Sequence, residues 1–212
     1  MTKGKLVFGI TKERKLLRKS FKPLRNYAAD ICVNVSGAEL TGDIKDIAHV
    51  CEKIGFKGAV WPKNGFLNIS IDDDFLKGIV TEKAKETALL GCGESFQEQY
   101  AVARIKSLLD TAKEKEFFFS PMKYDDVTKT IALIICEDEL FFYVKPVVDS
   151  ICNVFGNASP SFSYTQDAEK TVAELFIEAD RRRICFGQID IDLYKAVLNF
   201  LQKRDKGAAV DE

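Results

Sequence analysis

The stretch KETALLGCGESFQEQYAVARIKSLL, from Lys85 to Leu109, decides the fold that we expect for this chain. It begins with a short apolar run, which predicts a strand, and continues through a turn at Gly93. A helix over Ser95–Lys113 follows, and its start carries the capping-box pair Ser95 and Glu98. The stretch therefore predicts a strand, a glycine turn and a capped amphipathic helix.

The same order occurs again in RRRICFGQIDIDLYKAVLNFLQ, from Arg181 to Gln202. A glycine follows the strand in both copies, and a tyrosine (Tyr100 or Tyr194) comes seven positions after that glycine. Further upstream, a predicted helix at Asp46–Phe56 can be laid on Val147–Asn157. Since self-similarity of this kind indicates repeated units, we predict an internal duplication.

Strands are predicted at the corresponding places in both halves, with Ile31–Gly37 matched by Ile131–Asp138. Further strands are expected at Gly65–Ile71, Gly78–Thr81 and residues 172–178. Several strands followed by a long helix, made twice, are typical of an α+β protein. We predict two pseudo-symmetric repeats that form one curved antiparallel sheet, a saddle of about ten strands, with helices on its convex face.

This prediction also sets the domain boundaries. A basic N-terminal extension and a short tail would flank two repeats of similar length. The expected segments are the extension 1–26, repeat 1 at 27–116, repeat 2 at 117–204 and the tail 205–212.

Composition points to a globular protein that needs neither a membrane nor a cofactor. The 212 residues are 46% hydrophobic and 30% charged, and no apolar run is long enough to span a bilayer. Six cysteines in a chain without a secretion signal are expected to be reduced and mostly buried. His49 is the only histidine and is predicted to lie on a helix, so we expect no histidine-dependent triad, no metal site and no enzyme.

Charge is distributed unevenly along the sequence. Residues 1–26 contain nine Lys or Arg and one acid, whereas the remainder contains 22 basic and 31 acidic residues. A basic arm of this kind suits nucleic acid phosphates, although a solvated extension explains it as well.

The order of these segments resembles the TATA-box-binding protein family over about residues 24–204. No single motif carries the likeness, which lies in the order and spacing of four short segments. They are Asp43-Ile44-Lys45-Asp46-Ile47-Ala48, Trp61-Pro62-Lys63, Cys92-Gly93-Glu94-Ser95 and Asp192-Leu193-Tyr194-Lys195-Ala196.

The resemblance implies a nuclear transcription initiation factor that binds double-stranded promoter DNA in the minor groove. Such a protein wedges apolar side chains between base steps and recruits a factor IIB-like partner, other initiation factors and the RNA polymerase machinery. The residues that would contact DNA are Phe66, Thr81, Phe162, Phe176, Asn34, Asn68 and Arg182. Plain core packing is an equally good explanation of the three phenylalanines.

Two alternatives stay open at this point. In the first, the saddle fold holds proteins and binds DNA weakly or without specificity, as the acidic body would favour. The second belongs to translation. Gly65–Leu76 resembles the N-terminal domain of arginyl-tRNA synthetase, and Tyr100–Leu109 resembles its helical tRNA-binding domain. That alternative leaves the duplication unexplained and finds no catalytic core in this chain.

Overall fold

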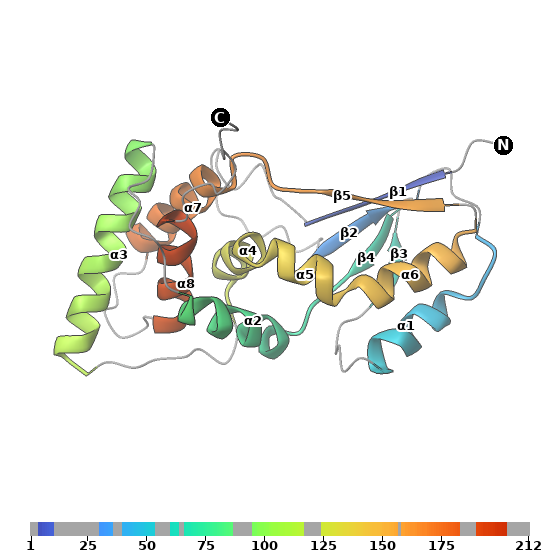
Figure 1. Cartoon of the computed structure of the whole chain (residues 1–212), viewed down its shortest axis with the longest axis horizontal. Helices are drawn as coiled ribbons and strands as arrows, with labels where there is room; N and C mark the ends of the chain where they lie inside the picture. Colours follow the sequence, from blue (N-terminus) through green and yellow to red (C-terminus); the bar gives the residue numbers. More distant parts are fainter. Residues whose placement is uncertain are drawn as a thin grey trace, which may run out of the picture. The chain divides into compact units, whose positions relative to one another are not determined.

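The computed structural model describes residues 4–10, 30–35, 40–53, 60–63, 66–86, 95–116, 124–156, 158–182 and 190–202. The described residues form five strands and eight helices (Figure 1). The chain divides into two compact units. Unit 1 consists of Met1–Lys77 and Cys136–Gln166, and unit 2 consists of Gly78–Ile135 and Asp167–Glu212.

Unit 1 contains the sheet. Its strands lie in the order β3-β4-β2-β1-β5. Three neighbouring pairs are antiparallel, while β1 and β5 run parallel. The strands are β1 (Gly4–Ile10), β2 (Ile31–Asn34), β3 (Val60–Lys63), β4 (Phe66–Ile69) and β5 (Ala158–Ser163).

Alternating apolar residues explain why β2 and β4 pair. Ile31 lies opposite Ile69 and Val33 lies opposite Leu67, and all four side chains are fully buried. A strand places every second side chain on the same face, so these two cross-strand pairs form one apolar layer. The Asp30 carboxylate closes the end of the pair by accepting a hydrogen bond from the Ile71 amide at 2.6 Å.

Two helices of unit 1, α1 (Ile44–Lys53) and α6 (Lys145–Val154), pack against each other and lie on the same side of the sheet (Figure 1). Asp43 caps α1, because its side chain accepts a hydrogen bond from the Lys45 amide at 2.9 Å. Thr41 joins the two helices: its hydroxyl donates to the Val154 carbonyl and accepts from the Gly156 amide. The short helix α5 (Glu137–Tyr143) precedes α6.

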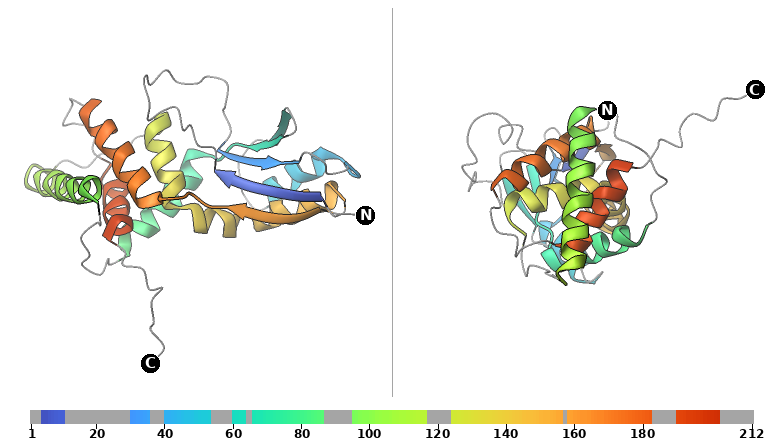
Figure 2. Two further views of the ribbon diagram at one scale, coloured as in Figure 1. Left: turned by 90° about the horizontal axis from the view of Figure 1, so that it is seen from above. Right: turned by 90° about the vertical axis from the view of Figure 1, so that its left-hand side faces the viewer.

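The described part of unit 2 is helical. Its long helix α3 (Phe96–Glu114) packs against α7 and α8, as Figure 2 shows. One face of α3 is buried, through Ala101, Val102, Ile105, Leu108 and Ala112. The other helices are α4 (Asp126–Ile135), α7 (Ala168–Arg182), α8 (Ile191–Gln202) and α2 (Asp73–Lys85), which begins in unit 1 and ends in unit 2.

The predicted saddle is wrong. The sheet has five strands among the described residues, one of its pairs is parallel, and all five strands lie in unit 1. Among the described residues, the order of helices and strands also differs from the two matching repeats that were predicted. The described residues before α4 include four strands, whereas those after it include only β5.

Three predicted strands are helices, and for residues 131–136 the reason is the ambiguity of a buried apolar run. Residues 131–136 lie in and just after α4, residues 172–178 lie in α7, and Gly78–Thr81 lies in α2. A short run that is apolar throughout suits a strand buried on both faces and a buried helix equally well. Each of residues 131–136 is at most 3% exposed, so burial on all sides removed the helical periodicity that would have revealed α4.

Some predicted elements are confirmed, and others lie outside the described residues. The helix that begins after Ser95 is confirmed, and so are the strands near Ile31 and Gly65. The tail 205–212 and residues 11–26 of the basic extension lie outside the described residues. No helix in the described part of the chain is long and apolar enough to cross a bilayer.

Candidate functional site

The residues expected to contact DNA fall in both units. Four lie on strands of unit 1. Asn34 ends β2 and pairs in register with Phe66, the first residue of β4. Asn68, on β4, is 5% exposed, so its side chain is not accessible to a ligand on the surface. Phe162 on β5 is 37% exposed and packs against Phe141, with ring centroids 4.7 Å apart.

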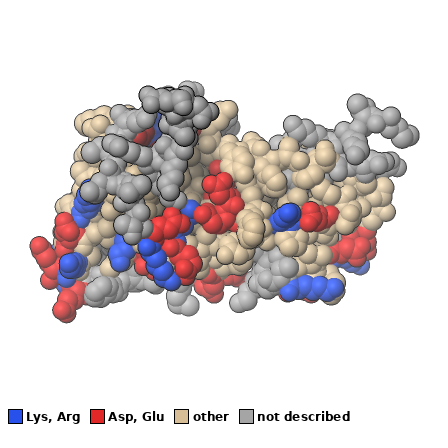
Figure 3. Space-filling model, viewed as in Figure 1, with Lys and Arg blue, Asp and Glu red and all other residues tan. Residues whose placement is uncertain are grey.

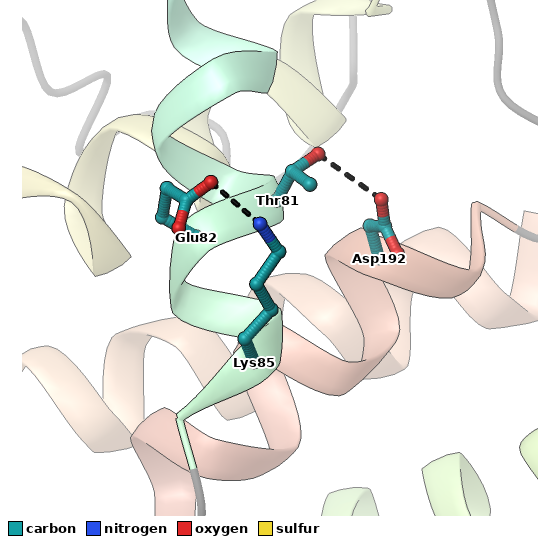
Figure 4. A network of polar contacts seen from close by, with 4 residues as sticks. All are labelled: Thr81, Glu82, Lys85 and Asp192. Atoms are coloured by element: carbon teal, nitrogen blue, oxygen red, sulfur yellow. Dashed lines mark hydrogen bonds and ion pairs between the residues drawn. The ribbon is translucent and has the colours of Figure 1, made fainter.

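The other three lie in unit 2 and on helices. Thr81 on α2 donates a hydrogen bond to the carboxylate of Asp192 on α8 at 3.0 Å, beside the Lys85–Glu82 ion pair (Figure 4). Phe176 on α7 is buried against Tyr194, as core packing requires. Arg182 ends α7. The structure therefore brings Asn34 and Phe66 together but does not unite the seven residues on one sheet face.

A different pair of side chains is presented to solvent at the start of α3. Phe96 is 77% exposed and Tyr100 is 47% exposed. They lie one helical turn apart, and their ring centroids are 6.4 Å apart with planes tilted by 31°. We call these two residues the α3 ring pair. Two adjacent exposed rings offer a flat apolar surface on which a planar group can stack.

The capping box fixes the helix turn that carries Phe96. The Ser95 hydroxyl accepts a hydrogen bond from the Glu98 amide, and the Glu98 carboxylate accepts one from the Ser95 amide, both at 3.3 Å. A further bond of 2.8 Å joins the Ser95 hydroxyl to the same carboxylate. These contacts satisfy amide groups that the first turn would otherwise leave unpaired, so the backbone below the rings is well held.

A bidentate ion pair anchors the next turn of α3. Arg104 Nε and Nη2 donate to the two carboxylate oxygens of Asp180 on α7, at 2.9 and 3.3 Å. This contact raises the pKa of Arg104 above its ordinary value, and the nearby Tyr100 and Tyr194 act in the same direction. The guanidinium is therefore a structural charge, already neutralised by Asp180.

Charges on the exposed part of α3 balance one another. Lys106 and Lys113 are exposed, and so are Asp110 and Glu114. Such a surface attracts phosphates only weakly, because phosphate binding depends on an excess of positive charge. Stacking does not need that excess, so this surface suits an unpaired base better than a double helix.

The cysteines do not form a reactive or metal-binding centre in the described part of the chain. Cys51 and Cys136 are buried, and burial raises the pKa of the Cys51 thiol to about 11. Burial also raises the pKa of Cys152. Among the described residues no cluster of three or more His, Cys, Asp or Glu could hold a metal ion.

The spacing of aromatic residues in α3 could have predicted the α3 ring pair from the sequence. Phe96 and Tyr100 lie four positions apart on the side of the helix opposite the buried Ile105. Aromatic residues at helical spacing on a polar face indicate a surface with a partner. No protein-family model, curated protein or solved structure matches the chain significantly.

Proposed function

We propose that this protein binds tRNA without catalysing a reaction, and that the α3 ring pair stacks on unpaired bases of the RNA. The observation that carries the proposal is the placement of two segments that resemble arginyl-tRNA synthetase. Gly65–Leu76, similar to the N-terminal domain of that family, spans β4 and the start of α2 in the unit that contains the sheet. Tyr100–Leu109, similar to its helical tRNA-binding domain, lies in α3 of the helical unit.

The fold also removes the main objection to this function. The predicted duplication was the feature that a tRNA-binding protein left unexplained, and the described elements do not repeat. The segment that resembles the helical tRNA-binding domain lies in the helical unit, and the segment that resembles the N-terminal domain lies in the other unit.

The chemistry of the exposed residues supports RNA over duplex DNA. Proteins recognise RNA sequence mostly at loops and ends, where unstacked bases lie on aromatic side chains. The α3 ring pair provides such a surface within the segment that carries the likeness. The nine basic residues in the first 26 positions would add attraction to phosphates that does not depend on sequence.

Promoter binding is the competing function. It depends on a broad concave sheet that meets the minor groove, and the five strands of the described residues do not form one. Binding of a TATA duplex, recruitment of a factor IIB-like partner and a nuclear location stay predictions. The assay below separates that function from tRNA binding.

The test measures the affinity of the full chain for a labelled tRNA transcript, a TATA duplex and a scrambled duplex by fluorescence anisotropy at two salt concentrations. We expect the tRNA to bind most tightly. The double substitution Phe96→Ala with Tyr100→Ala should weaken tRNA binding by tenfold or more, because one stacked base contributes about 1–3 kcal/mol. Tighter binding of the TATA duplex than of the tRNA would overturn the proposal.

A matched control removes two exposed rings elsewhere. Phe142 and Tyr143 on α5 are 73% and 50% exposed, and they also lie side by side. The double substitution Phe142→Ala with Tyr143→Ala should leave tRNA affinity unchanged. Equal losses in both double variants would show that the assay reports exposed aromatic area and not a site on α3.

A further inference from the structure

A second exposed aromatic surface lies in unit 1. Phe142 and Tyr143, at the end of α5, meet edge to face, with ring centroids 5.8 Å apart. Tyr143 makes a second edge-to-face contact with Phe75 in the first turn of α2, also at 5.8 Å. We call Phe75, Phe142 and Tyr143 the α5 patch. Exposed contiguous aromatic surface of this kind marks interaction sites in soluble proteins.

The structure of α5 explains why these rings point outward. Glu137, Leu140 and Phe141 form the buried side of this helix. The Glu137 carboxylate accepts hydrogen bonds from the amide and the hydroxyl of Thr165, which fixes the start of α5 beside the chain that follows β5. With that side committed to the core, Phe142 must face solvent.

Carboxylates surround the α5 patch. Asp138 lies one helical turn before Phe142, and Glu139 lies one turn before Tyr143. On α2, Asp73 and Asp74 directly precede Phe75. In Figure 3, Asp and Glu side chains are visible where α2 and α5 lie in Figure 1, with some Lys or Arg side chains among them.

The basic residues nearest in sequence are fewer than the acids. Lys77 follows Phe75 on α2, and Lys145 follows Tyr143 at the start of α6. Apart from the buried Glu137, the residues from Asp72 to Lys77 and from Asp138 to Lys145 contain five carboxylates against these two lysines. The surface around the α5 patch is therefore both aromatic and negatively charged.

We infer that the α5 patch binds an arginine-rich or lysine-rich segment of a partner protein. An arginine guanidinium stacks favourably on the faces of aromatic rings and forms strong hydrogen bonds with carboxylates. The rings of the α5 patch and the carboxylates next to them on α5 and α2 supply both kinds of group. The same negative charge repels phosphates, so neither a nucleic acid nor an anionic membrane fits this surface.

The inference does not depend on tRNA binding, because it rests on different residues in a different unit. The exposed charges of α3 balance one another, whereas the residues around the α5 patch carry an excess of carboxylates. A basic partner and an RNA can therefore be tested with separate variants.

The test uses the full chain and a fluorescein-labelled amphipathic peptide of about twelve residues with arginines on one face and leucines on the other. The arginine peptide should bind the wild-type protein, and a peptide with glutamates in place of the arginines should not. Phe142→Ala with Tyr143→Ala should weaken binding by about tenfold, since aromatic anchors carry most of the energy at such sites. Asp138→Asn with Glu139→Gln should weaken binding and reduce its dependence on salt.

Three results of the peptide assay would overturn the inference. They are undetectable binding of the arginine peptide, an affinity that neither double variant changes, and equal binding of the two peptides. Self-association of the wild-type protein that Phe142→Ala with Tyr143→Ala abolishes would also do so, because a second copy would then cover the rings. An unchanged far-ultraviolet circular dichroism spectrum and melting temperature in these variants is the control that the protein remains folded.

Discussion

The α3 ring pair and the α5 patch present the same kind of side chain in different surroundings. Phe96 and Tyr100 lie on a helix whose exposed charges balance and whose nearest arginine is paired with Asp180. Phe142 and Tyr143 lie beside carboxylates of α5 and α2. Exposed aromatic rings alone therefore indicate an interaction surface. The charges around the rings indicate the class of partner that it binds.

The largest expected effect comes from shortening a side chain on the buried face of α3. Ile105 is fully buried on that face, so Ile105→Ala should lower the free energy of unfolding by about 2–5 kcal/mol. The matched variant is Ile69→Ala, which removes an equally buried side chain from the sheet of unit 1.

Urea denaturation with native-state hydrogen exchange measures both variants. In Ile105→Ala, protection should fall mainly in α3, α7 and α8, whereas in Ile69→Ala it should fall mainly in β2 and β4. Equal loss of protection across both units in each variant would show that the two compact units do not act as separate parts.

The second prediction asks whether Arg104 is structural. Arg104→Ala should lower the free energy of unfolding by about 1 kcal/mol, because its side chain keeps 34% of its surface exposed to water and screening limits the ion pair. The salt dependence of tRNA binding should stay the same, because Asp180 already neutralises this charge.

Lys106→Ala, an exposed change on the same helix, is the control and should alter stability by less than about 0.5 kcal/mol. A clear drop in the salt dependence of tRNA binding in Arg104→Ala would instead make this residue a phosphate contact.

The third prediction concerns the cap of α3. Ser95→Ala removes the hydroxyl that accepts from the Glu98 amide, so it should cost about 1 kcal/mol of stability. Ser107→Ala, on the exposed side of the same helix, should cost nothing measurable. Thermal unfolding by circular dichroism compares the two. Equal melting temperatures would mean that the capping box contributes little to holding Phe96.

The smallest expected effect depends on pH. Asp190 caps α8, where its carboxylate accepts from the Leu193 amide at 3.1 Å, and burial is the main cause that raises its pKa above the ordinary 3.8. Because folding raises this pKa, the stabilising contribution of the protonated form is present below pH 3.8 and is lost as the pH rises through the folded-state pKa.

Asp190→Asn keeps the accepting oxygen without the charge. It should therefore gain stability relative to the wild type as the pH is raised toward neutrality, whereas Asp190→Ala should lose stability at every pH. Chemical denaturation at several pH values measures the difference. A constant difference between Asp190→Asn and the wild type would contradict the raised pKa.

Sequence patterns predicted the elements that have one buried and one exposed face. The alternation at Ile31 and Val33 located β2, and the Ser95–Glu98 pair located the start of α3. They failed for residues 131–136, because a segment buried on every side has no periodicity to read. The strand predicted there had completed the match between the two halves, which also rested on the glycine and tyrosine spacing of Lys85–Leu109 and Arg181–Gln202.

The candidate site was missed for a related reason. Phe176 was predicted to be exposed on a sheet, but α7 turns it into the core against Tyr194. Phe96 lies within Lys85–Leu109, from which the helix α3 was correctly predicted. Its exposure depends on which side of α3 packs against α7 and α8. Sequence alone places a ring on a helix, whereas exposure is a property of the packing.

The most direct test of the central claim is the tRNA affinity of two double variants measured side by side with the wild type. We expect Phe96→Ala with Tyr100→Ala to weaken tRNA binding at least about tenfold, the scale of lost base stacking, and Phe142→Ala with Tyr143→Ala to leave it unchanged. An undiminished affinity in the first variant, or an equal loss in both, would contradict it.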